Sequence, residues 1–210
     1  PKRLSDIVSG MDFLDVQGNS EQSVTGLSYD SRECKPGYLF FALPGIHSDG
    51  KYYIQAAVRQ GAVGVVYEGM LDPPDARTLE KVAFLRVADC RWAMSAISST
   101  FYDNPSDSLC VIGVTGTEGK STTVSLIYQL LKLAGYRAGF FSTVMSDTGD
   151  GERPNPRHQT TPESTAVQEM LAQMRDHGLA FAVVEASSHG LSQRTARLAH
   201  VHFDIGLVTN

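Results

Sequence analysis

Short apolar runs recur along the first half of the chain. Three runs rich in β-branched and aromatic residues predict buried strands, at residues 38–43 (YLFFAL), 63–68 (VGVVYE) and 82–87 (VAFLRV). Between and after them, residues 52–62 and 90–102 carry apolar side chains at helical spacing. This alternation predicts a small α/β domain, which we place at residues 1–104.

A turn-rich stretch, DNPSDS at residues 103–108, precedes a second set of apolar runs. Four runs predict strands, at residues 109–114, 137–144, 180–186 and 203–209. Because helical segments separate most of these strands, we expect a parallel sheet with its site at the carboxyl ends of the strands. We place this second domain at residues 108–210.

Two helices, a polar segment and a short helical piece are predicted to connect the strands of the second domain. Helical spacing follows the first strand and stops at Gly135. Thr161 can cap a helix that opens at Pro162 and runs to about His177. Residues 146–159 form a polar excursion rich in glycine and proline, and residues 192–199 predict a short helical piece.

Composition excludes several classes of function. The net charge of −5 and the absence of a basic run argue against nucleic acid as a partner. No apolar stretch reaches the roughly 20 residues of a membrane span, and the N-terminal PKRLSDIVSG lacks the apolar core of a signal peptide. We therefore expect a cytoplasmic protein without a membrane partner. The three cysteines lack metal-ligand spacing and are expected to be reduced and structural: Cys34, Cys90 and Cys110.

A glycine-rich turn, GVTGTEGKSTT at residues 113–123, connects the first strand of the second domain to its helix. The common phosphate loop reads G-x-x-x-x-G-K-[ST], and counting back from Gly119 puts Val114 where its first glycine should stand. Loop N–H groups and the positive helix end can face phosphates in this context. We expect Lys120 to reach the outer phosphates and the Ser121 hydroxyl to hold Mg²⁺. The alternative is an ordinary strand-to-helix turn with an exposed lysine.

Glu185 ends the apolar run AFAVV, where an acidic side chain can meet the Mg²⁺ of a phosphate loop on a neighbouring strand. A solvated glutamate at a strand end is the alternative. The following residues 187–197, SSHGLSQRTAR, collect hydroxyls, an imidazole, an amide and two guanidinium groups. Such a loop suits an anionic, polyhydroxylated substrate.

These motifs resemble those of the Mur ligase family. The turn at residues 113–123 is similar to the family's longer phosphate loop, which accounts for the extra residue. The segments TTPE at 160–163 and EASSHGL at 185–191 resemble the MurE type of the family. The stretch YDSRECKPGYLFFALPGIHSDG at 29–50 is similar to the family's UDP-binding N-terminal domain.

The resemblance implies a fold and an activity. It implies a UDP-substrate-binding domain at residues 1–104 and the first part of a P-loop-type, parallel-sheet ATPase domain at 108–210, with the C-terminal amino-acid-binding domain absent. It implies an ADP-forming ligase that adds a diamino acid to UDP-MurNAc-L-Ala-D-Glu through an acyl phosphate, in cytoplasmic peptidoglycan precursor synthesis. We expect a monomer, and we expect residues 1–210 alone to be inactive. Which diamino acid is used is not encoded in these residues.

The resemblance also implies roles for individual residues. The catalytic residues would be Lys120 and Glu185, and Mg²⁺ would be held by Ser121 and Glu185. The ATP-binding loop would comprise Gly116, Thr117, Glu118, Gly119, Lys120, Ser121 and Thr122. The substrate would contact Ser31, Ile46, His47, Ser48, Gln159, Thr160, Thr161, Ser187, Gln193 and Arg197.

Two positions depart from a simple transfer of roles. Glu118 stands where the family usually has asparagine, and a carboxylate beside a triphosphate should repel it unless the side chain points away or reaches a metal. The family's substrate arginine matches Arg194 when counted forward from Leu191 and Arg197 when counted back from Phe203; we prefer Arg197.

Other protein classes fit less well. Folylpolyglutamate synthetases share the long phosphate loop, but the Asp-Ser-Arg segment at 30–32 and EASSHGL at 185–191 argue against them. A GTPase would need an Asn-Lys-x-Asp motif, which the sequence lacks. A UDP-sugar-binding module without catalytic activity stays open.

Overall fold

Parallel strands dominate both halves of the chain, so the predicted α/β class is confirmed. The computed structural model describes residues 1–45, 48–155 and 160–210, and the chain divides into two compact units, Pro1–Phe101 and Tyr102–Asn210. No helix within these described ranges combines the length and the apolar character needed to cross a membrane.

The first unit contains a five-stranded sheet in the order β2-β7-β6-β5-β4. Its central strands are parallel, and β2 pairs antiparallel with β7 at one edge. The strand bounds are β2 Asp15–Gln17, β4 Gly26–Ser28, β5 Tyr38–Ala42, β6 Gly64–Glu68 and β7 Ala83–Val87, with β1 Lys2–Arg3 and β3 Ser23–Val24 pairing separately. The helices are α1 Leu4–Ile7, η1 Gly50–Tyr53, α2 Ile54–Arg59, α3 Ala76–Leu79 and α4 Cys90–Phe101.

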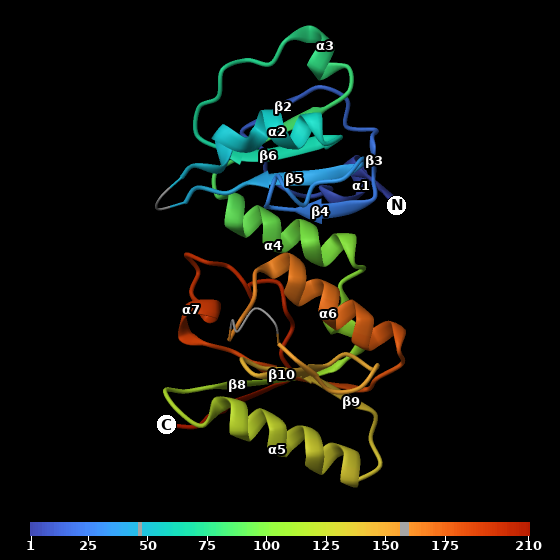
Figure 1. The fold of residues 1–210 in the computed structure, drawn as a ribbon, viewed down its shortest axis with the longest axis vertical. Helices are drawn as coiled ribbons and strands as arrows, with labels where there is room; N and C mark the ends of the chain where they lie inside the picture. The colour runs from blue at the N-terminus through green and yellow to red at the C-terminus, as the bar shows by residue number, and fades with distance from the viewer. Residues whose placement is uncertain (46–47, 156–159) are drawn as a thin grey trace. The chain divides into compact units, whose positions relative to one another are not determined.

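The sheet of the first unit is buried on both faces, which explains the continuous apolar run YLFFAL. Successive side chains of a strand point to opposite faces of the sheet. Phe40 therefore packs in the hydrophobic cluster on one face, and Phe41 packs in the cluster on the other face. α2 contributes to the Phe40 cluster and α4 to the Phe41 cluster, and Figure 1 shows these helices on opposite faces of the sheet. Complete burial of one phenylalanine contributes about 1.5 to 3 kcal/mol.

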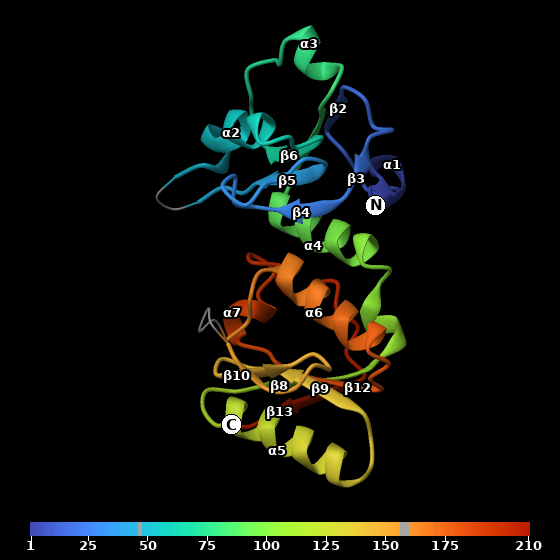
Figure 2. The same ribbon diagram turned by 45° about the vertical axis from the view of Figure 1, so that its right-hand side comes forward.

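The second unit contains a six-stranded sheet in the order β11-β10-β9-β12-β8-β13. The four predicted strands form its parallel part, as β8 Cys110–Thr115, β9 Ala138–Phe141, β12 Phe181–Glu185 and β13 Ile205–Val208. Two helices, α5 Lys120–Leu133 and α6 Ser164–Asp176, cover opposite faces of the sheet, as Figures 1 and 2 show. Two short helices complete the unit, η2 Pro105–Ser108 and α7 Ser188–Leu191.

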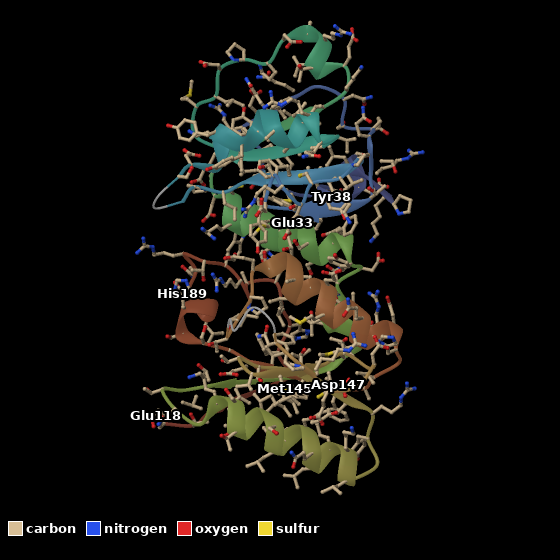
Figure 3. The ribbon with its side chains drawn as sticks, in the orientation of Figure 1. Glu33, Tyr38, Glu118, Met145, Asp147 and His189 are labelled. Atoms are coloured by element: carbon tan, nitrogen blue, oxygen red, sulfur yellow. The ribbon has the colours of Figure 1, made fainter. Side chains whose placement is uncertain are left out.

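An antiparallel hairpin stands where the sequence predicted only a polar excursion. β10 Met145–Asp147 and β11 Arg153–Pro154 pair with each other, and β10 extends the sheet beside β9. The buried Asp147 carboxylate, labelled in Figure 3, anchors this hairpin. It accepts hydrogen bonds from the Tyr128 hydroxyl (2.6 Å) and from the N–H of Gly149 (2.8 Å). The hydrogen bond to Tyr128 joins the hairpin to α5, and apolar periodicity does not reveal a polar contact of this kind.

The Tyr128–Asp147 contact shifts both titrations. Burial and the hydrogen bond to Asp147 raise the pKa of Tyr128. Burial acts to raise the pKa of Asp147, but the Tyr128 hydroxyl and the N–H groups of Gly149 and Gly151 outweigh it, so this pKa lies below its usual value. The carboxylate is therefore ionised and the phenol neutral near pH 7.

Two local predictions are wrong. The helix α6 begins at Ser164 with Glu163 at its N-cap position, so Thr161 is not the cap. The short helix near the C-terminus is α7, and the predicted helical piece at 192–199 forms turns instead. Ala196 there has a positive φ of 50°, which interrupts any helix.

β13 forms one edge of the sheet, pairing with β8. Its Ile205 and Val208 side chains are 50% and 70% exposed, whereas β12 lies between β8 and β9 with its residues from Ala182 to Glu185 buried. Burial of a strand and pairing on both edges slow its local opening.

This difference predicts the pattern of amide exchange in the second unit. In residues 1–210 we expect the β12 amides to exchange at least roughly a hundredfold more slowly than those of β13, because β12 opens only when the sheet does. Hydrogen–deuterium exchange read by peptide mass spectrometry measures both strands in one sample. Equal protection of the β12 and β13 amides from exchange would contradict the expectation that β12 opens only together with the sheet.

Candidate active site

The glycine-rich loop lies between the end of β8 at Thr115 and the start of α5 at Lys120. Gly116 and Gly119 have φ angles of +137° and +78°, a region that side-chain-bearing residues rarely adopt. The loop is therefore a tight turn from a buried strand into a helix of 14 residues, which is the context predicted for a phosphate loop.

The polar groups of the loop point in two directions. The Lys120 ammonium donates to the carbonyl oxygens of Gly116 and Thr117, both at 2.9 Å. The N–H groups of Thr117 and Glu118 both donate to Oδ1 of Asn210, at 2.7 and 3.3 Å. Adjacent N–H groups thus converge on one oxygen acceptor, a property that phosphate-binding loops share.

The Glu118 side chain is exposed, at the margin of the second unit (Figure 3). An exposed carboxylate is solvated by water of high dielectric constant, which weakens its repulsion of a nearby anion. The departure from the family's asparagine is therefore compatible with a bound polyphosphate.

Ser121 and Glu185 meet at the carboxyl edge of the sheet. Ser121, in the first turn of α5, donates its hydroxyl hydrogen bond to Oε2 of Glu185 at 2.9 Å. Glu185 stands at the end of β12, where the parallel register pairs it with Val114 beside the loop. The sequence predicted this meeting from the rule that carboxyl ends of parallel strands share one edge.

Thr143 is a third member of this cluster and was missed by the sequence analysis. Its N–H donates to Oε2 of Glu185 at 2.8 Å, and its hydroxyl lies 3.2 Å from Oε1 and 2.9 Å from the Thr160 hydroxyl. Thr143 follows β9, so the strand-end rule that selected Glu185 also points to it.

These contacts leave the Glu185 carboxylate 1% exposed and held by neutral donors, a serine hydroxyl and the N–H and hydroxyl of a threonine. Burying a carboxylate is costly unless a cation or several hydrogen bonds compensate. Among the described residues no cluster of three or more His, Cys, Asp or Glu side chains could hold a metal. A carboxylate beside hydroxyl oxygens is nevertheless a donor set of the hard kind that Mg²⁺ prefers, so the residues fit this ion.

Thr161 connects the strand end to the loop that follows it. Its buried hydroxyl donates to the Glu185 carbonyl at 3.1 Å and accepts from the Ser187 N–H at 3.0 Å. The Ser187 hydroxyl in turn caps α7 by accepting from the Gly190 N–H at 3.0 Å. A Cβ on Gly190 would lie 2.5 Å from Thr161, so only glycine permits this approach.

Arg197 contacts the same group of residues around Thr161. Its guanidinium donates to the Thr161 carbonyl at 2.6 Å and to Glu163 Oε1 at 2.7 Å. Arg194 and Gln193 are exposed on the turn that precedes it. The structure therefore brings Thr160, Thr161, Ser187 and Arg197 together near Glu185, while Gln193 lies outside these contacts.

Ser31 and Ser48, which are expected to line the UDP site, belong to the first unit. Ser31 is buried just after β4, between Asp30 and Arg32, which form an ion pair. The Ser48 hydroxyl donates to the Tyr53 hydroxyl at 2.9 Å. The remaining expected contacts, Ile46, His47 and Gln159, lie outside the described residues.

Comparison with known proteins connects both units to one family. The model of the Mur ligase family, catalytic domain, matches residues 23–102, and the model of the Mur ligase middle domain matches residues 114–210. A UDP-N-acetylmuramyl-tripeptide synthetase of Treponema denticola is 49% identical over 220 residues, covering 100% of this chain and 41% of the relative. A UDP-N-acetylmuramoyl-L-alanyl-D-glutamate--2,6-diaminopimelate ligase of Bacteroides fragilis is 35% identical over 208 residues, covering 99% and 41%.

A solved structure agrees with these relatives. The structure of a UDP-N-acetylmuramoyl-L-alanyl-D-glutamate--2,6-diaminopimelate ligase superimposes with a TM-score of 0.76 at 28% identity, covering 100% of this chain and 40% of its own. The chain spans about two fifths of the length of the relatives it matches. Two family models, these relatives and the shared fold agree with the motifs of the sequence: the chain belongs to the Mur ligase family and is similar to its MurE-type members.

Proposed function

We propose that this chain forms the UDP-substrate-binding and ATP-binding part of a ligase that adds a diamino acid to UDP-MurNAc-L-Ala-D-Glu. The activity would be ADP-forming and would serve peptidoglycan precursor synthesis in the cytoplasm, with the protein acting as a monomer. The names of the relatives support the substrate class. The observation that carries the proposal is the buried Glu185 carboxylate against Ser121, in the first turn of α5 after the phosphate loop.

The reaction would proceed in two transfers. The γ-phosphoryl group of ATP passes to the D-glutamyl carboxylate, and ADP leaves. The amine of the diamino acid then attacks the carbonyl carbon of the acyl phosphate, forming the amide and releasing phosphate. The first transfer brings two anions together, so its barrier depends on how well the site neutralises negative charge.

The residues from Gly116 to Thr122 would bind the polyphosphate. The N-terminus of α5 and the loop N–H groups supply partial positive charge, and the Lys120 ammonium supplies a full one. The Lys120 ammonium donates to two carbonyl oxygens of the loop itself, so a change of side-chain rotamer would bring it to a phosphate bound there. These groups would stabilise the charge that develops during phosphoryl transfer.

Ser121 and Glu185 would hold Mg²⁺, with Thr143 fixing the Glu185 carboxylate. The bound ion would neutralise part of the phosphate charge. The two hydrogen bonds from Thr143 restrict the carboxylate to one orientation, so little reorganisation is needed when the cation arrives.

The loops around Thr161 would shape the pocket for the UDP substrate. Direct contacts would come from Thr160, Thr161, Ser187, Gln193 and Arg197. The Thr161 hydroxyl, which is hydrogen-bonded to the Glu185 carbonyl and the Ser187 N–H, would also hold the two loops together. In the first unit, Ser31 would contact the uridine, and Ile46, His47 and Ser48 would line the UDP site beside it. Gln159 would join the contacts in the second unit.

The first test replaces Lys120 by alanine in the full-length protein. We expect ligation to fall about a hundredfold or more, because one preorganised cationic donor is lost at the reacting phosphate. UDP-substrate binding, measured by calorimetry, should stay unchanged. Lys132→Ala, at the other end of α5, is the matched control and should retain activity.

Loss of UDP-substrate binding in Lys120→Ala would contradict separate nucleotide and UDP-substrate sites. A wild-type protein that binds the UDP substrate but releases no phosphate with ATP and the diamino acids present would instead favour a UDP-sugar-binding module without catalytic activity.

A second test replaces Glu185 by glutamine, which removes the charge and keeps the shape. The Mg²⁺ concentration for half-maximal activity should rise at least roughly tenfold, because an anionic metal ligand is lost. Glu169→Gln, on the exposed face of α6, should leave the Mg²⁺ titration unchanged. Identical Mg²⁺ titrations of Glu185→Gln and the wild type would show that this carboxylate is purely structural.

A further inference from the structure

The end of β13 runs alongside the phosphate loop. Val208 pairs in register with Thr115, and the N–H of Thr209 donates to the Thr115 carbonyl at 2.9 Å. The next two side chains, Thr209 and Asn210, therefore lie beside the loop residues that follow β8. Neither residue was assigned a role by the sequence motifs.

Asn210 and Lys120 hold opposite sides of the same two peptide units. In the unit between Gly116 and Thr117, the N–H donates to Asn210 Oδ1 and the carbonyl accepts from Lys120. In the unit between Thr117 and Glu118, the N–H again donates to Asn210 Oδ1, and the carbonyl again accepts from the Lys120 ammonium. The N–H and C=O of a trans peptide point in opposite directions, so the two side chains together fix the rotation of both units.

Thr209 also contacts the loop, and its position explains why residue 116 is a glycine. Its hydroxyl donates to the Glu118 carbonyl at 2.6 Å. A Cβ on Gly116 would lie 2.1 Å from Thr209 Oγ1 and 3.1 Å from Asn210 Oδ1. Gly116 is thus required for close packing on Thr209 as well as for its positive φ.

We infer that Asn210 and Thr209 are positioning residues for the nucleotide phosphates. They hold the peptide units of residues 116–118 in place before nucleotide binds, and through those units they place the Lys120 ammonium. A loop whose peptide units already hold one orientation needs little backbone reorganisation when phosphate arrives, which favours both binding and transfer. The inference rests on the proposed phosphate-binding role of the loop.

The test compares three variants of the full-length protein with wild type. Asn210→Leu keeps the size of the side chain and removes the Oδ1 acceptor. Thr209→Val replaces the hydroxyl by a methyl group, whereas Thr209→Ser keeps the hydroxyl. We expect Asn210→Leu and Thr209→Val to weaken Mg²⁺-ATP binding by about five- to tenfold, the effect of one or two lost hydrogen bonds. Thr209→Ser should bind Mg²⁺-ATP as the wild type does. Val208→Ala, an exposed neighbour on β13, is the control and should bind normally.

Calorimetry with Mg²⁺-ATP and with the UDP substrate separates the outcomes. A loss confined to Mg²⁺-ATP supports positioning. Equal losses for both ligands, or a loss in Val208→Ala, would show general destabilisation and overturn the inference. Unchanged ATP binding in Asn210→Leu would also overturn it, as would tighter binding, because Asn210 would then compete with phosphate for the loop N–H groups. Absence of ATP binding in the wild type would instead defeat the proposed function, and the inference with it.

Discussion

A carboxylate that is 1% exposed to water, that of Glu185, accepts hydrogen bonds from Ser121 on α5 and from Thr143 after β9. These bonds join the end of β12 to the phosphate loop on one side and to the neighbouring strand on the other. A buried carboxylate held by neutral groups gains most from a cation. The arrangement of the second unit therefore depends on a negative charge kept in place at the edge of the sheet.

The parallel sheet makes this arrangement possible. Because β8, β9, β12 and β13 run in one direction, their carboxyl ends supply Thr115, Thr143, Glu185 and Thr209 to one edge. Close approach of the chain segments at that edge then requires glycine where a Cβ would collide, as at Gly116 against Thr209 and at Gly190 against Thr161. The cluster is built from strand ends, and the glycines permit its contacts.

The parallel strands and the pair of Ser121 and Glu185 could be predicted from the sequence, because apolar runs mark each strand and the carboxyl ends of parallel strands meet at one edge. The hairpin at β10 and β11 could not, because neither rule marks the contact of Asp147 with Tyr128 that anchors it. Thr161 was misread as a helix cap because its partners, Glu185 at the end of β12 and Ser187 after it, are distant in the sequence. The role of Asn210 was equally hidden, because 92 and 93 residues separate it from the N–H groups that it accepts from.

A crystal structure of the full-length protein with Mn²⁺ in place of Mg²⁺ and a non-hydrolysable ATP analogue would locate both the nucleotide and the metal. We expect phosphate oxygens on the N–H groups of the loop and an anomalous Mn²⁺ peak beside Ser121 and Glu185. A nucleotide bound away from residues 116–122, or a metal peak with no contact to Glu185 or Ser121, would contradict this expectation.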